Sequence, residues 1–78
     1  MRLEIYTPEW SRTIEDVEAV FLPGSVFPFE VLRNHAPMIS ALESGEVRWR
    51  VSGAEESIMT KGGLARIKDN VIKVCAEV

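Results

Sequence analysis

The segment Leu22–Leu42, LPGSVFPFEVLRNHAPMISAL, is interrupted three times by proline and once by glycine. Pro23 and Gly24 stand near its start, Pro28 lies near its middle, and Pro37 comes just before a closing apolar run. Proline fixes φ and lacks the N–H that a helix interior or a central strand needs, and proline and glycine both favour turns. We therefore expect the backbone to turn, run briefly extended and turn again.

Several short segments on both sides of this stretch alternate apolar and polar residues. They are 2–6, 47–51 and 71–76. A period of two is typical of strands with one buried face. Turn-forming residues separate such segments at intervals of roughly eight to twelve residues, a spacing typical of a sandwich or a barrel. The last of these turns, Asp69-Asn70, has the two-residue length of a tight hairpin.

The segment 13–21 fits two kinds of secondary structure. As a helix it would place Ile14, Val17 and Phe21 on one face. As a strand it would run through Val17, Ala19 and Phe21. The β-branched residues favour the strand.

Length and composition indicate a single small globular domain over residues 1–78. Hydrophobic residues make up 46% of the chain, which argues against disorder, and the net charge of −3 gives no general attraction to nucleic acid or anionic lipid. No apolar run approaches the about 20 residues needed to cross a bilayer, so we expect no direct membrane insertion. The single cysteine, Cys75, cannot form an internal disulfide, and we expect a buried or half-buried thiol in a reducing compartment.

No group of residues has the spacing of a catalytic or metal site. His35 is the only histidine, and with one distant cysteine it lacks the further ligands that a metal ion requires, so we expect it in a turn or an interface. Gly62-Gly63 lacks the glycine spacing and the following Lys-Ser/Thr of a phosphate-binding loop, which favours a turn or bulge with positive φ. We therefore expect no catalytic residue, no metal and no cofactor.

Two other function classes stay open at this point. Arg48-Trp49-Arg50 alternates base and aromatic, as in a small nucleic-acid-binding β-barrel. In a strand, however, Trp49 faces away from both arginines and is expected in the core, with the arginines on a solvated face. Lys61 is the second candidate, because small carrier domains place a modified lysine in a hairpin turn. Their Met-Lys-Met order differs from the Met-Thr-Lys order found here.

The order of these motifs is similar to that of the epsilon subunit of F-type ATP synthases. The matching pieces are Leu-Pro-Gly from Leu22, Phe-x-Val-Leu from Phe29, Asn-His-Ala-Pro from Asn34, and the double glycine followed by a polar two-residue turn. The opening strand also fits, so the resemblance covers nearly the whole chain. It implies an all-β fold, a small antiparallel β-sandwich of roughly eight to ten short strands. Both the segment 38–42 and the ambiguous segment described above would then be strands.

The resemblance implies a non-catalytic rotor subunit in the central stalk of the ATP synthase. Such a subunit binds the foot of the gamma subunit and docks it on the membrane ring of c subunits, which couples ion translocation to ATP synthesis. Residue by residue, the resemblance places toward gamma Thr7, His35 and Ser40, and toward the c-ring Ser25, Val26, Phe27, Pro28 and Glu30. The implied location is the cytoplasmic face of the inner (plasma) membrane, as a peripheral protein.

The chain departs from the family pattern at the ring-facing turn. Family members often have an acidic residue followed by glycine where this chain has Val26-Phe27, and an acidic residue where it has Pro28. The usual charged contact is therefore absent or shifted to Glu30, and we expect Val26-Phe27 to be an exposed apolar tip that replaces it. Many members continue into two C-terminal helices, which in some bind ATP. The present sequence ends at Val78 before them, and we expect no specific ATP binding.

Overall fold

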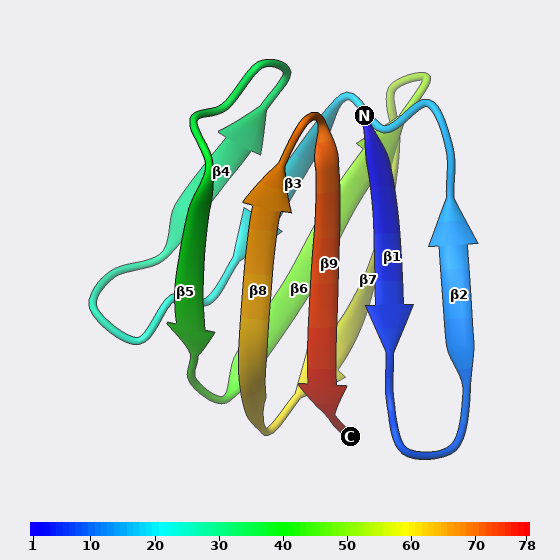
Figure 1. Ribbon diagram of the computed structural model, residues 1–78. Coiled ribbons are helices and arrows are strands. Elements are labelled where there is room, and N and C mark those ends of the chain that lie inside the picture. Colours follow the sequence, from blue (N-terminus) through cyan, green and yellow to red (C-terminus); the bar gives the residue numbers. More distant parts are fainter.

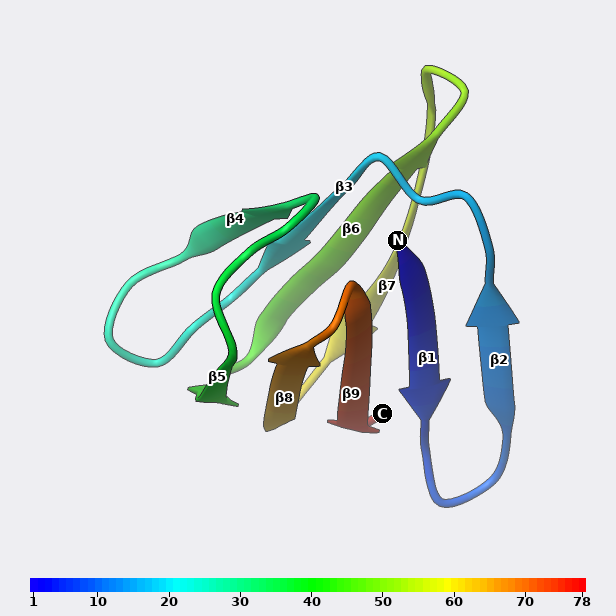
Figure 2. The same ribbon diagram turned by 45° about the horizontal axis from the view of Figure 1, so that its top comes forward.

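The computed structural model describes residues 1–78 as two packed β-sheets without a helix (Figures 1 and 2). Its nine strands are β1 (Arg2–Tyr6), β2 (Ser11–Ile14), β3 (Ala19–Leu22), β4 (Phe29–Leu32), β5 (Met38–Leu42), β6 (Gly45–Val51), β7 (Ala54–Thr60), β8 (Gly62–Lys68) and β9 (Val71–Glu77). One sheet has five strands in the order β2-β1-β9-β8-β5, and the other has four in the order β4-β3-β6-β7. The expected all-β sandwich is confirmed, and the structure holds no helix able to span a bilayer.

One strand pair is parallel, which the expectation of an antiparallel sandwich did not include. β1 lies between β2, to which it is antiparallel, and β9, to which it is parallel. A parallel pair needs a long crossover. Here all the strands between β1 and β9 form that crossover. The first and last strands of the chain therefore lie next to each other in the interior of the five-stranded sheet.

The segment 13–21 is not one strand, and this part of the prediction is wrong. β2 ends at Ile14, and the chain passes from one sheet to the other before β3 begins at Ala19. Asp16 adopts a positive φ of 57°, and the backbone of Val17 exchanges two hydrogen bonds with that of Met1. This crossing buries Val17 in the core although it belongs to no strand. The segment 38–42, by contrast, forms β5 as expected.

The tight turn predicted at Asp69-Asn70 is confirmed, and a second one occurs at Ser52-Gly53. Asp69 and Asn70 have φ values of 52° and 59°, and Ser52 and Gly53 have 49° and 79°. Two consecutive residues with positive φ are typical of the two-residue hairpin turn whose twist matches that of the flanking strands. The β8–β9 and β6–β7 hairpins follow from these two turns.

The core lies between the sheets and is built from the inward residue of each alternating pair. Fourteen buried side chains form one cluster, and Trp49 at 1% exposure is the largest of them. The predicted alternation in 47–51 and 71–76 is confirmed, since Val47, Trp49, Ile72 and Val74 are all buried while the residues between them face outward.

Candidate interaction surfaces

The loop between β3 and β4, residues 23–28, is tied closely to the end of β5. Gly24 forms an isolated bridge with Leu42, and the backbone N–H of Ser25 and its Oγ both donate to the carbonyl oxygen of Ala41 at 2.9 Å. The N–H of Glu43 donates in return to the carbonyl oxygen of Pro23 at 2.9 Å. These bonds make the loop a defined feature of the surface.

Gly24 is required for the close packing inside this loop. A Cβ atom at this position would lie 2.5 Å from the carbonyl oxygen of Phe27 and 2.9 Å from the ring of Phe29. The two phenylalanine rings pack edge to face, with centroids 6.2 Å apart. Edge-to-face packing is a preferred arrangement of aromatic pairs. The Phe29 ring therefore supports the base of the loop while Phe27 reaches further out.

Val26 and Phe27 form an exposed apolar tip at the end of the loop. Val26 is 90% exposed and Phe27 is 64% exposed, which confirms the expectation for Phe27. Behind the tip, toward β5, lies an apolar pocket of about 290 Å³. It is lined by residues of the loop and of β5, and Ser25 and Ser40 both belong to it.

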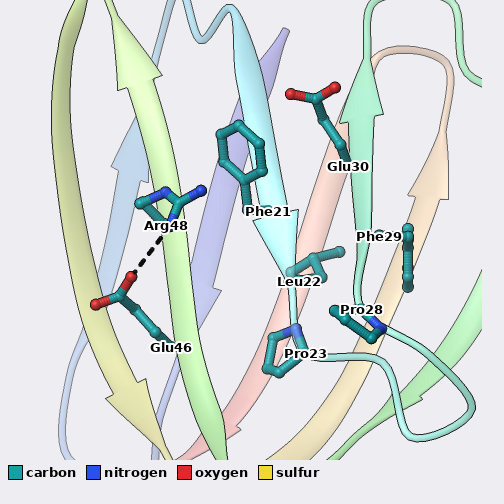
Figure 3. A pocket seen from close by; sticks show the side chains of 8 residues that line it. All are labelled: Phe21, Leu22, Pro23, Pro28, Phe29, Glu30, Glu46 and Arg48. Atoms are coloured by element: carbon teal, nitrogen blue, oxygen red, sulfur yellow. Dashed lines mark ion pairs between the residues drawn. The ribbon is translucent and has the colours of Figure 1, made fainter.

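A second hollow lies on the other side of the loop, on the outer face of the four-stranded sheet (Figure 3). Its volume is about 440 Å³. Phe21 forms part of its floor, and the guanidinium of Arg48 lies 4.2 Å from the centre of that ring. Glu30 lies directly opposite Phe21 in the strand register. It is exposed and makes no ion pair. In Figure 3 the Glu30 carboxylate lies apart from Arg48, which pairs instead with Glu46 at 3.5 Å.

The five residues expected to face the ring thus lie on one loop and the strand that follows it. Ser25, Val26, Phe27 and Pro28 belong to the loop, and Glu30 projects from β4. Pro28 and Phe29 line the hollow that contains Glu30, and Phe29 also lines the pocket behind the tip. The apolar tip therefore stands between two hollows that share an aromatic wall.

The three residues expected to face gamma do not form one cluster. Thr7 lies in the β1–β2 turn, where its Oγ1 accepts from the N–H of Trp10 at 3.0 Å and donates to the carbonyl oxygen of the same residue. His35 lies in the β4–β5 turn, with Nδ1 2.7 Å from the carbonyl oxygen of Ala36. These turns are at opposite ends of the sandwich, and β9 and β8 separate β1 from β5 (Figure 1). Ser40 lies on β5, where its Oγ donates to the carbonyl oxygen of Ala41, the same oxygen that accepts from Ser25 of the loop.

The His35 turn is held against the β8–β9 turn by two asparagines. The N–H of Asn34 donates to Oδ1 of Asn70 at 2.6 Å, and Nδ2 of Asn70 donates to Oδ1 of Asn34 at 3.1 Å. Both residues have positive φ, which asparagine tolerates better than most residues. Nothing in the local sequence indicated this contact.

The whole chain matches the model of one protein family. That family is described as ATP synthase, Delta/Epsilon chain, beta-sandwich domain, and the match covers residues 1–78. The chain belongs to this family. This delta/epsilon-type sandwich is similar to the ATP synthase epsilon chain of Desulfitobacterium hafniense, with 39% identity over 75 residues, 96% of this chain and 57% of that protein. It is similar to the epsilon chain of Nitratidesulfovibrio vulgaris at 38% identity over 77 residues, 99% of this chain and 58% of that protein.

The chain spans a little over half the length of these curated relatives. Solved structures share its fold at low sequence identity. A chain in the central stalk and c-ring structure of the Tetrahymena thermophila mitochondrial ATP synthase has a TM-score of 0.84 at 12% identity, with 99% of this chain and 63% of that chain covered. A chain of the Euglena gracilis mitochondrial ATP synthase has a TM-score of 0.85 at 18% identity, with 95% and 48% covered.

The delta/epsilon assignment and the geometry leave little support for the other two function classes. The buried ring of Trp49 has no face on which a nucleobase would stack. Arg48 and Arg50 face outward, as expected, but they pair with glutamates and stack on Phe21 instead of standing free. Lys61 is exposed between β7 and β8, in a family whose description mentions no carrier domain.

Cys75 corrects one expectation for this delta/epsilon sandwich. It was expected to be buried or half-buried, but it is exposed on the outer face of β9. The reason is strand parity, because Val74 and Ala76 take the two inward positions on either side of it.

Sequence patterns also missed a polar network on the outer face of β1. Glu4 is almost buried there and accepts hydrogen bonds from the hydroxyl of Tyr6 at 2.6 Å and from Nε of Arg2 at 2.9 Å. The bond from Tyr6, with the nearby charges of Arg2 and Lys73, holds the pKa of the Glu4 carboxyl below its ordinary value. The same bond raises the pKa of Tyr6.

Proposed function

We propose that this chain is the β-sandwich part of a non-catalytic rotor subunit of an F-type ATP synthase. In this role it binds the gamma subunit and docks that subunit on the c-ring, so that ion translocation is coupled to ATP synthesis. The observation that carries the proposal is the family match over residues 1–78. The relatives' name, ATP synthase epsilon chain, supports the same role.

The proposed work of the domain is mechanical. A rotor element must stay folded and bound while torque passes through it, so the area and packing of its contacts matter more than any titrating group. The ring contact is assigned to the apolar tip Val26-Phe27, with Ser25, Pro28 and Glu30 around it. The loop's hydrogen bonds to β5 support this assignment, because a preorganised loop loses little conformational freedom on binding.

The proposed contact with gamma is assigned to Thr7, His35 and Ser40. Since Thr7 and His35 lie in turns at opposite ends of the five-stranded sheet, gamma would have to contact the sandwich over an extended surface. Ser40 lies beside the loop that carries the apolar tip, so the gamma and ring surfaces would be continuous at β5. The proposed location is peripheral, at the cytoplasmic face of the inner (plasma) membrane.

Binding to gamma tests the proposal directly. The purified chain and the gamma subunit of the same organism are mixed at micromolar concentrations and separated by size-exclusion chromatography. We expect one peak that contains both proteins. Separate elution of the two proteins would overturn the proposal.

A further inference from the structure

Four of the nine lysine and arginine residues lie together on the outer face of the five-stranded sheet, beside the β8–β9 turn. With Asp69 and Val71 they line a hollow of about 290 Å³. We call it the cationic hollow, and its basic residues are Arg2 on β1, Arg66 and Lys68 on β8, and Lys73 on β9. Figure 1 shows these three strands side by side, with the N-terminus and the β8–β9 turn at the same end.

The strand register explains why these side chains meet. Arg66 is directly opposite Lys73 across the β8–β9 hairpin. Lys68 and Arg2 stand on either side of Val71, with which both are paired. Like charges directly opposite each other on neighbouring strands destabilise a sheet. The pairing of Arg66 with Lys73 is therefore unfavourable for folding, and Glu4, which lies opposite Lys73 on the β1 side, offsets part of this cost.

Three carboxylates lie in or beside this hollow: Asp69 lines it, Glu4 lies opposite Lys73 in the strand register, and Glu15 is near Arg2. Arg2 is paired, since its Nε lies 2.9 Å from Glu4 and 3.9 Å from Glu15. The other three basic residues, Arg66, Lys68 and Lys73, make no ion pair and no side-chain hydrogen bond, and Asp69 is the only acidic residue that lines the hollow with them.

Three arginines outside the hollow, Arg12, Arg48 and Arg50, all make ion pairs, while Arg33 and Lys61 make none. Arg12 pairs with Glu56, and Arg48 and Arg50 both pair with Glu55. Arg48 and Arg50 of the four-stranded sheet are thus neutralised by Glu55 of the same sheet, whereas Arg66, Lys68 and Lys73 of the cationic hollow make no ion pair. On a chain whose net charge is −3, this is a local excess of positive charge facing solvent.

We propose that the cationic hollow binds an oxyanion of the phosphate class, held by Arg66, Lys68 and Lys73. Guanidinium and ammonium groups donate charge-assisted hydrogen bonds, which phosphate oxygens accept well. Val71 is the only apolar residue of the lining, so the hollow offers no aromatic or apolar wall for a nucleobase. Recognition is therefore of the phosphate group itself, whether it is free phosphate, the phosphate of a nucleotide or a phospholipid headgroup. The site does not depend on the proposed rotor function.

Nuclear magnetic resonance titration of the ¹⁵N-labelled chain tests the site. Sodium phosphate and ATP are added in turn, and vesicles of phosphatidylglycerol are compared with vesicles of phosphatidylcholine. We expect saturable shifts of the amides of residues 66–73, with a Kd of about 1 mM for phosphate. Binding should weaken when ionic strength rises from about 10 mM to about 150 mM, because the Debye length falls from about 30 Å to about 8 Å.

Matched variants separate the site from general surface charge. Arg66→Gln with Lys73→Gln should weaken phosphate binding at least about fivefold, whereas Lys61→Gln, at an exposed lysine outside the hollow, should change it less than about twofold. Thermal melting without the anion checks that all variants fold. Shifts with phosphate and ATP would identify a soluble phosphate as the ligand, and binding to phosphatidylglycerol vesicles alone would identify a lipid headgroup. Absence of binding in every arm, or equal weakening by Lys61→Gln, would overturn the proposal.

Discussion

At the scale of single residues, Phe27 has a defined position on the surface but contributes little to the stability of the fold. Its ring is 64% exposed and touches the domain mainly through its edge-to-face contact with Phe29. The loop beneath it is held by Gly24 and Ser25, whose bonds to β5 do not involve the ring. Phe27 is therefore a candidate anchor for a partner, against which an aromatic side chain buries about 150–250 Å².

Phe27→Asp tests this division of roles. We expect the free energy of unfolding to change by no more than about 0.5 kcal/mol, as for most surface substitutions. Attachment to the c-ring and ion-coupled ATP synthesis in reconstituted vesicles should both fall. Val20→Asp is the contrast, because Val20 is fully buried and a charge there should prevent folding. A fall of many degrees in the melting temperature of Phe27→Asp would show that Phe27 belongs to the core, and unchanged coupling would show that the tip does not touch the ring.

The Glu4 network makes a prediction about pH. Because the hydrogen bond from Tyr6 is the largest cause of the lowered pKa of Glu4, Tyr6→Phe should raise that pKa toward its ordinary value of 4.5. A carboxyl whose folded pKa is depressed stabilises the fold above its unfolded pKa, and this contribution is lost as pH falls through the folded pKa. The variant should therefore lose less stability in acid than the parent chain does.

The measurement is a titration of the Glu4 side-chain carboxyl carbon by nuclear magnetic resonance, together with melting temperatures as a function of pH. Arg2→Gln serves as the comparison, since Arg2 acts on Glu4 by charge and by one hydrogen bond. Equal titration midpoints in the parent chain and Tyr6→Phe would show that the tyrosine hydroxyl does not control the carboxyl.

At the scale of strands, β8 depends on a glycine where it starts. Gly63 has a φ of 149°, and a Cβ atom there would collide with the backbone carbonyl of Cys75 on β9. Gly62 has a similar φ of 145°, so the double glycine supplies the positive φ that the sequence predicted. The close approach of the β9 backbone requires glycine at position 63, because no side chain fits there.

Gly63→Ala should destabilise the domain by about 1–3 kcal/mol, because the two strands must move apart to admit a methyl group. Gly53→Ala is the matched control. Gly53 also has a positive φ, 79°, but no atom lies within 4 Å of the position of its Cβ. Its replacement should cost only about 1 kcal/mol, which reflects backbone conformation alone. Chemical denaturation measures both, and similar costs would show that the contact with β9 is unimportant.

The like charges of Arg66 and Lys73, which face each other across the β8–β9 hairpin, lead to a second prediction at this scale. Arg66→Glu replaces a like-charge pair with an opposite-charge pair across from Lys73. The variant should gain about 0.2–1 kcal/mol of stability at low salt, and the gain should shrink as salt is added. Lys61→Glu makes the same charge change outside any strand and is the control. Equal gains in the two variants would attribute the effect to net charge instead of strand pairing.

At the scale of the whole molecule, the two sheets share one small hydrophobic core, so neither sheet can bury its inner face without the other. Trp49 fills much of the space between them, and Arg12 covers it from β2, with its guanidinium 5.6 Å from the indole centre. Arg12 also pairs with Glu56 at 3.2 Å, which joins an edge strand of one sheet to an edge strand of the other. At the β2 and β7 edges of the sandwich, the Arg12 side chain thus covers the buried ring of Trp49.

Trp49→Ala should therefore affect the whole domain. Removing a buried tryptophan costs about 3–5 kcal/mol. Since domains have about 0.05–0.15 kcal/mol of stability per residue, a chain of 78 residues has little to spare. We expect a largely lost or strongly lowered melting transition by circular dichroism. Arg12→Ala should cost far less, because an exposed ion pair contributes about 0–1 kcal/mol. A melting temperature close to the parent value in Trp49→Ala would contradict this account of the core.

Much of the architecture was predictable from local sequence. Strand periodicity placed Trp49 and Val74 inside, because a period of two is a property of neighbouring residues. The Asp69-Asn70 hairpin was predictable for the same reason, since a turn needs only the residues that form it. The exposure of Phe27 followed from its place between a glycine and a proline.

Other features depend on residues that are far apart in the chain, and the tertiary structure alone decided them. The parallel pairing of β1 with β9 brings Arg2 beside Val71, and only then does the cationic hollow exist. The change of sheet at Asp16 split a segment that looked continuous, because Val17 bonds to the backbone of the distant Met1 and packs into the core between the sheets. The sequence by itself determined most of the strands, their turns and the family, but not the break between Ile14 and Ala19. Packing between distant strands determined which charges meet, because strand pairing and electrostatic contact act through space and leave no local periodic pattern.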